Sequence, residues 1–176
     1  MGGTEAEGAT DARACVDDIL ASFPIEYLAR QGGEFFVFLD VENSPALSEA
    51  YYTGWAETLR IYSRERSENA VSLLPCVYAA QSNQATWTVL SRTHEAGIPC
   101  YGVWVAHYHS TECSAQRPQW EGEFLTPEIK LPCPILIWQY AENCVNGQVD
   151  LSQVNPNINL DNDLLAKLIL PPPTEI

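Results

Sequence analysis

The stretch FFVFLDVENS, residues 35–44, runs from five apolar residues into two carboxylates that lie two positions apart, Asp40 and Glu42. An apolar run without alternation is typical of a strand buried on both faces of a parallel sheet. Side chains alternate along a strand, so Asp40 and Glu42 point to the same side. The stretch therefore predicts a buried parallel strand with two acids at its carboxyl end.

The rest of the chain alternates between helical and strand patterns. Helices are expected over residues 11–28, 44–66, 85–97 and 162–170, and further strands over residues 71–80, 100–108, 135–140 and 149–151. Ser44 and Pro45 fit the start of a helix, and Gly97 fits a left-handed helix end. Pro75 predicts an irregularity in its strand. This order indicates an α/β fold with a parallel sheet, either covered on both faces or closed into a barrel.

Length and composition favour a single domain. The chain has 176 residues, of which 46% are hydrophobic, and it contains five tryptophans. This is enough to bury one sizeable core. We expect a flexible N-terminus at residues 1–10, one domain over residues 11–170 and a proline-rich tail at residues 171–176.

The net charge of −14 narrows the choice of partners. A strongly acidic surface repels nucleic-acid phosphates and anionic membranes, so neither is expected as a partner. No apolar run approaches the roughly 20 residues of a membrane span, and the first residues lack the pattern of a secretory signal. Small neutral or cationic ligands remain open.

The six cysteines show no CxxC spacing, which disfavours zinc ribbons and thioredoxin-like sites. Cys113, Cys133 and Cys144 lie near expected loops, where one disulfide is expected in an oxidising compartment. Cys76 and Cys100 lie in apolar runs and are expected to be buried thiols.

The carboxyl groups of Asp40 and Glu42 suggest acid catalysis. Their Cα atoms lie roughly 6 to 7 Å apart on a strand, close enough for repulsion to raise one pKa. A protonated Glu42 beside an ionised Asp40 is the arrangement that cleaves a glycosidic bond. The alternative is structural, since Asp and Glu end many strands and Asn43 and Ser44 are ordinary turn and capping residues.

The other strands also end in aromatic and amide groups. Apolar sugar faces stack on aromatic rings, and sugar hydroxyls bond to polar tips, so these groups suit a carbohydrate site. For Trp104 and Trp138, core packing is an equal alternative. The residues concerned are Tyr78, Trp104, Tyr108, Trp138, Gln139 and Tyr140.

The sequence gives less support to a metal site and to a cysteine nucleophile. His107, His109 and Cys113 could ligate a transition metal only if the strand continued through them, so no metal and no cofactor is expected. A cysteine nucleophile paired with His94 lacks an elbow motif, and Cys76 and Cys100 lie in apolar runs where they would be inert.

Five short motifs in order then resemble glycoside hydrolase family 25 lysozymes, and resemble more closely the related glycoside-hydrolase-like domains of unknown function. They are DVE at 40–42, VY at 77–78, WVAHY at 104–108, WQY at 138–140 and VDL at 149–151. The resemblance runs from about Asp11 to Val154. It implies a (β/α) TIM-like barrel and no metal.

The resemblance also implies roles for individual residues. Glu42 matches the general acid, and Asp40 matches the carboxylate that stabilises charge at the reacting sugar. Asp150 matches an acid of the last strand, and Gln139 and Tyr140 match a substrate-facing strand end. The implied substrate is peptidoglycan, cut at its β-1,4 aminosugar linkages.

The chain departs from that family at its start. A first strand with a G-x-D-x-S type motif and two further strand and helix units do not precede residue 11, so we expect a partial or truncated barrel with one unpaired edge. The alternatives are an inactive carbohydrate-binding or structural domain and an incomplete barrel fragment. Family members act outside the cytoplasm, which suggests a secreted protein, although no export signal is visible.

Overall fold

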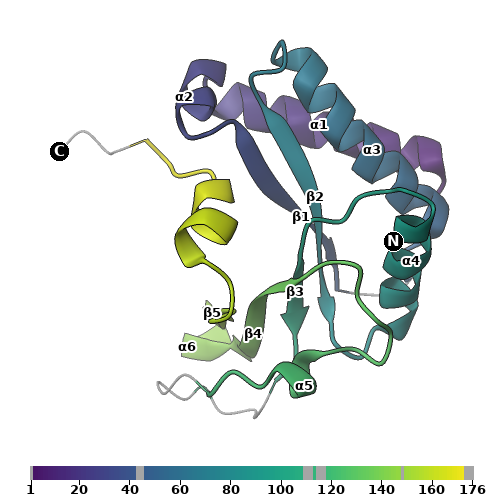
Figure 1. The fold of residues 1–176 in the computed structure, drawn as a ribbon, viewed down its shortest axis with the longest axis vertical. Helices are drawn as coiled ribbons and strands as arrows, with labels where there is room; N and C mark the ends of the chain where they lie inside the picture. The colour runs from purple at the N-terminus through teal and green to yellow at the C-terminus, as the bar shows by residue number, and fades with distance from the viewer. Residues whose placement is uncertain (1, 43–45, 109–112, 114–117, 148, 173–176) are drawn as a thin grey trace.

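The computed structural model describes residues 2–42, 46–108, 113, 118–147 and 149–172 (Figure 1). Its helices are α1 (Glu5–Ser22), α2 (Ile25–Arg30), α3 (Glu49–Arg66), α4 (Gln84–Glu95), α5 (Gly122–Leu125) and α6 (Cys144–Gly147). Its strands are β1 (Glu34–Val41), β2 (Ser72–Ala80), β3 (Val103–Ala106), β4 (Ile135–Asn143) and β5 (Val149–Val154). A π-helical turn, η1 (Leu160–Leu164), and a 3-10 turn, η2 (Leu165–Lys167), follow.

The described strands form one curled sheet in the order β1-β2-β3-β4-β5, with the shape of a half-barrel. β1 to β4 are parallel, as expected from the apolar strands separated by helices. β5 is antiparallel to β4, so the prediction of a parallel sheet is wrong for this strand. The reason is the short connection through α6, which is too short for the crossover that a parallel pair requires.

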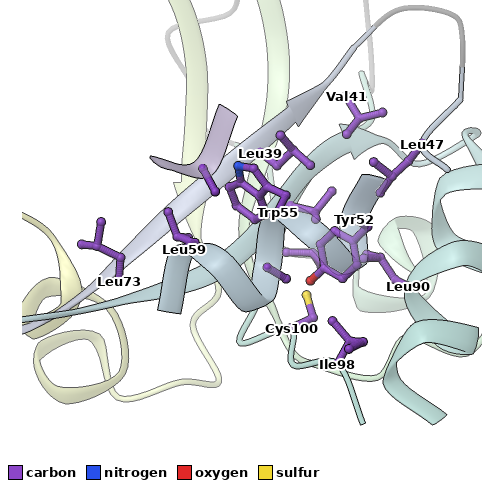
Figure 2. Packing of buried hydrophobic residues seen from close by; sticks show 14 of the residues in the cluster. Leu39, Val41, Leu47, Tyr52, Trp55, Leu59, Leu73, Leu90, Ile98 and Cys100 are labelled. Atoms are coloured by element: carbon purple, nitrogen blue, oxygen red, sulfur yellow. The ribbon is translucent and has the colours of Figure 1, made fainter. Parts of the chain in front are cut away.

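The core lies between one face of this sheet and the helices α3 and α4. Phe35, Leu39 and Val41 of β1 point to this side, and Tyr52 and Trp55 of α3 pack against the sheet. Figure 2 shows Leu39, Tyr52 and Trp55 within this layer. The opposite, concave face carries the intervening side chains of the strands.

Helix α1 packs against α3, and its Ala12 and Val16 belong to the same buried cluster as the strands. Gly8 and Gly54 lie where the two backbones cross, because a Cβ atom on Gly8 would lie 2.1 Å from the Tyr51 carbonyl oxygen. A Cβ atom on Gly54 would lie 2.0 Å from the Glu5 carbonyl oxygen. The contact therefore depends on glycine at both positions.

Several element boundaries differ from the expected ones. Helix α1 begins at Glu5, because Thr4 and Glu7 form a capping box, so residues 5–10 are helical where we expected a flexible end. Pro24 ends the hydrogen-bonding pattern of the expected helix 11–28 and starts α2 as a separate helix. The helix expected at 162–170 is the pair of short turns η1 and η2.

Helix α3 begins at Glu49, later than the expected start at residue 44. Ser48, whose hydroxyl accepts a hydrogen bond from the Tyr51 N–H at 3.1 Å, is its N-cap. Ser44 and Pro45, the residues expected to start this helix, lie outside the described residues. The third strand is shorter than expected, at Val103–Ala106.

The backbone conformation confirms the prediction made for Gly97 and contradicts the one made for Pro75. Gly97 has a φ of +91° and ends α4 as expected; the Ile98 N–H donates to the Thr93 carbonyl, which completes the left-handed cap. Pro75 causes no irregularity in the ladder with β1, where it pairs with Val37 in unbroken register. Its carbonyl accepts from Tyr101 on the other side, so its missing N–H faces away from β1.

The cysteines divide as expected. Cys113 and Cys144 form a disulfide, and Cys76 and Cys100 are buried thiols. Among the described helices, none is long and apolar enough to cross a membrane.

Candidate active site

Two rows of side chains cross the concave face at the carboxyl ends of the strands. In the lower row Asp40 of β1 pairs in register with Tyr78 of β2, and Tyr78 pairs with Trp104 of β3. In the upper row Ala80 pairs with Ala106, and Ala106 with Gln139. Residues predicted from separate motifs are thus brought together by the strand register.

The lower row and Gln139 of the upper row line a first cavity of about 440 Å³. Its aromatic floor is built on Trp104, whose ring meets Phe38 edge-on at 5.8 Å and Tyr78 edge-on at 5.4 Å between centroids. The volume falls in the range of small-ligand sites. The lining residues are Phe38, Asp40, Glu42, Tyr78, Trp104, Gln139, Asp150 and Ser152.

The carboxylates of Asp40 and Glu42 both line this cavity. The pKa of Asp40 is raised, first because burial disfavours its charged form and second because the Glu42 carboxylate repels it. A hydrogen bond from the Glu42 backbone N–H opposes this rise without cancelling it. Repulsion within the pair was expected, but the raised pKa belongs to Asp40, the member expected to be ionised.

Tyr78 connects the two sides of the cavity. Its hydroxyl donates to Glu42 Oε1 at 3.1 Å and also contacts the side-chain oxygen of Gln139. Burial, followed by the nearby Tyr108 and Glu42, raises the pKa of Tyr78 well above its ordinary value. Because the hydroxyl keeps its proton, it acts as a hydrogen-bond donor that holds the Glu42 carboxylate in place.

A second cavity of about 410 Å³ adjoins the first and shares Glu42 and Tyr78 with it. The small side chains of Ala80 and Ala106 are among those lining it, where larger residues would take up the space. Its other lining residues are Ser82, His107, Tyr108 and Glu142.

Tyr108 and Glu142 both line this second cavity, next to Tyr78. Burial, followed by the nearby Glu142, raises the pKa of Tyr108 to about 12. The second cavity therefore brings together Glu42, Tyr78, Tyr108 and Glu142, which lie at or just beyond the ends of β1, β2, β3 and β4.

Two predicted residues lie away from the cavities. Trp138 has no exposed surface, packs edge-on against Phe124, and donates its indole N–H to the His107 carbonyl at 2.7 Å. Tyr140 packs against Trp138 and lines neither cavity. Alternation explains this, because Gln139 faces the cavity and its two chain neighbours must face the other way.

Asp150 lines the first cavity, but its carboxylate already has a backbone partner. The Asn143 N–H donates to Asp150 Oδ1 at 2.9 Å and so closes the turn between β4 and β5. This residue therefore has a structural role in addition to its place at the cavity.

The described residues that were considered as ligands of a transition metal do not form a metal site. The His107 ring stacks on Phe124 at 3.8 Å, and its Nδ1 lies 2.9 Å from the Phe124 carbonyl oxygen. His109 lies outside the described residues. Within the part of the chain that the structure describes, no group of three or more His, Cys, Asp or Glu side chains could hold a metal ion.

Sequence reasoning missed Phe38, Ser152, Ser82 and Glu142. Phe38 and Ser152 could have been found, because each lies two positions from a predicted residue on the same strand. Glu142 carried no comparable signal, since its contact with Tyr108 joins the ends of two different strands.

Replacing Asp40 by asparagine is expected to raise the melting temperature at neutral pH. With its pKa raised in the folded state, ionised Asp40 destabilises the fold, and this penalty grows as pH rises above the unfolded value of about 3.9. The gain should vanish near pH 3, where Asp40 is protonated in both states. Thermal unfolding followed by circular dichroism at the two pH values measures it.

Asp18→Asn on the exposed side of α1 is the control for removing one negative charge from an acidic chain. A lower melting temperature for Asp40→Asn than for the wild type at neutral pH would contradict the prediction.

Comparison with known proteins finds one solved structure with a similar fold. The sequence matches no protein-family model and no curated protein. Among solved structures, an uncharacterized protein from B. stearothermophilus, determined at 1.07 Å resolution, has a similar fold with a TM-score of 0.62 and 19% sequence identity. The alignment covers 95% of this chain and 68% of that one. At this identity the likeness shows a shared fold alone.

Proposed function

We propose that this protein is a glycoside hydrolase of the lysozyme type, built on a partial (β/α) TIM-like barrel, which cleaves β-1,4 bonds in an aminosugar polymer. The observation that carries the proposal is the pair Asp40 and Glu42 at the carboxyl end of a parallel strand, facing a cavity with an aromatic floor. In α/β barrels the carboxyl ends of the strands carry the catalytic groups.

The proposed reaction assigns a separate role to each acid. Glu42 gives its proton to the glycosidic oxygen while the bond from that oxygen to the anomeric carbon breaks. Asp40, as a carboxylate, stabilises the positive charge that develops at the sugar ring. Water then adds to the anomeric carbon, and the proton it releases returns to the carboxylate pair.

The surroundings of the pair support these roles. Tyr78 positions the Glu42 carboxyl by its hydrogen bond, and Gln139, only 3% exposed, offers an amide to a sugar hydroxyl. The positive charge of the transition state also favours the ionised form of Asp40, which offsets the upward shift of its pKa in the empty site. Trp104 and Phe38 provide the apolar surface for a pyranose ring.

A carbohydrate-binding domain without turnover is the second candidate. One observation favours it: the carboxylate of Asp150 is bonded to the backbone of the β4–β5 turn rather than free to act on a substrate. In that case the cavities would hold a glycan without cleaving it.

The test is the release of new reducing ends from a panel of aminosugar glycans, including peptidoglycan, by the purified protein. The Glu42→Gln protein serves as the control for a contaminating hydrolase. Release by the wild type alone supports the proposal. No release from any glycan, by a protein that near-ultraviolet circular dichroism shows to be folded, overturns it.

A further inference from the structure

Two free thiols face each other at the amino ends of β3 and β4. Cys100 lies just before the start of β3, and Cys133 lies just before the start of β4. Their sulfur atoms are 3.1 Å apart. This separation exceeds the length of a disulfide bond by only about 1 Å. We call these two residues the thiol pair.

Hydrogen bonds hold the backbone on both sides of the thiol pair. The Val103 N–H donates to the Pro134 carbonyl at 3.0 Å, which joins the start of β3 to the residue that follows one thiol. The Tyr52 hydroxyl of α3 donates at 2.9 Å to the carbonyl of Pro99, the residue that precedes the other thiol. Figure 2 shows Cys100 next to Tyr52. Both sulfur atoms are therefore carried by fixed backbone.

One member of the thiol pair is accessible to small molecules. Cys133 is half-buried and lines a cavity of about 840 Å³, together with Trp120 and Asn155 among others. Cys100 is buried and lies behind it. A small oxidant that enters this cavity would therefore meet Cys133 first.

The chain already contains one disulfide, between Cys113 and Cys144. Disulfides form and persist in oxidising surroundings. Surroundings that maintain this disulfide also act on the thiol pair, whose sulfur atoms are already in contact.

We propose that Cys100 and Cys133 are a redox-active pair that forms a second disulfide when the protein meets a small disulfide oxidant such as oxidised glutathione. The inference does not depend on the proposed function. It assigns a modification site on the amino-end side of the sheet, away from Asp40 and Glu42 at the carboxyl end of β1.

The reaction is a pair of thiol–disulfide exchanges. The Cys133 thiolate attacks one sulfur of oxidised glutathione, forms a mixed disulfide and releases one glutathione, which takes up the proton that Cys133 lost. Cys100 then loses its proton, attacks the Cys133 sulfur and displaces the second glutathione. The two cysteines together lose two protons and two electrons, and one glutathione disulfide becomes two thiols.

The new bond would join the strands that carry part of the first cavity. Trp104 of β3 and Gln139 of β4 both line that cavity, and the register of β3 on β4 shifts between Val103 and Trp104. The bond would fix the two strands just before this irregularity. The two cysteines are 33 positions apart, so the cross-link also restricts a long loop in the unfolded chain.

The test begins with protein reduced by dithiothreitol and then treated with oxidised glutathione. A hydrogen bond to Cys100 and burial raise the pKa of Cys133, so the oxidation is run at about pH 8.5, where more thiolate forms. Cleavage after glutamate places Cys100, Cys113, Cys133 and Cys144 in four different peptides. Mass spectrometry without reduction should find the peptides of Cys100 and Cys133 joined.

Thermal unfolding provides a second measurement. The melting temperature of oxidised wild type minus that of reduced wild type should exceed the same difference for Cys133→Ser by about 5 to 10 °C. Taking the difference within each protein removes the effect of the substitution on packing. Cys15→Ser removes a free thiol of α1 and should behave as the wild type does.

Three results would overturn the inference. The first is a sample in which the peptides of Cys113 and Cys144 are joined but those of Cys100 and Cys133 are not. The second is glutathione retained on Cys133 without a bond to Cys100. The third is an equal gain in melting temperature for the wild type and Cys133→Ser.

Discussion

Glu42→Gln is expected to lower the rate of glycan cleavage by about 10²–10⁴-fold, the range for removal of a general acid. Glutamine keeps the size of the side chain and an oxygen that can accept from Tyr78 Oη, but it has no proton to give to the leaving group. The loss should therefore appear in kcat, with KM nearly unchanged.

Steady-state kinetics on a soluble aminosugar oligomer, followed by reducing-end release, measure this effect. Glu95→Gln removes a carboxylate outside both cavities and should leave the rate unchanged. A Glu42→Gln protein with wild-type kcat would show that the proton comes from another group. A rise in KM alone would indicate that Glu42 contributes binding instead of proton transfer.

Gly54→Ala is expected to destabilise the protein by about 3 kcal/mol, at the upper end of the usual cost of overpacking. The added methyl group would lie 2.0 Å from the Glu5 carbonyl oxygen, and a backbone atom cannot move aside as a flexible side chain can. Helix α1 must then shift away from α3, which exposes Ala12 and Val16, both fully buried in the native structure.

Urea unfolding monitored by circular dichroism measures the loss of free energy of unfolding. Gly122→Ala is the matched control, because a Cβ atom there meets only the Trp120 indole nitrogen at 3.8 Å. An unchanged denaturation midpoint for Gly54→Ala would show that α1 does not pack on α3 at this distance in solution.

The sequence predicted the parallel part of the sheet and the lower row of the site because both follow from alternation within single strands. Asp40 and Glu42 lie two positions apart and share a face, and the register of β1 on β2 brings Tyr78 beside Asp40. Alternation along β4 also puts the Gln139 side chain on the opposite face from those of Trp138 and Tyr140. The interpretation of the WQY motif had assigned all three residues to the substrate site, because it did not take this alternation into account.

Other features depend on contacts between distant segments, which local patterns do not contain. The direction of β5 follows from the brief turn through α6, and the early start of α1 from Thr4 capping a helix that packs on α3. The second cavity depends on Glu142 at the end of β4 meeting Tyr108 beyond the end of β3. No spacing along the chain indicates such a pairing.

The disulfide between Cys113 and Cys144 makes the shape of the second cavity depend on the redox state of the surroundings. Both sulfur atoms lie 3.7 Å from the Glu142 carbonyl oxygen, so the cross-link braces the backbone that carries this acid. It closes a loop of 31 residues, a constraint on the unfolded chain worth roughly 3 to 4 kcal/mol. Oxidising solution keeps the rim of the site covalently fixed, whereas a reductant releases that rim and leaves the helical layer over Phe35 and Leu39 without any covalent change.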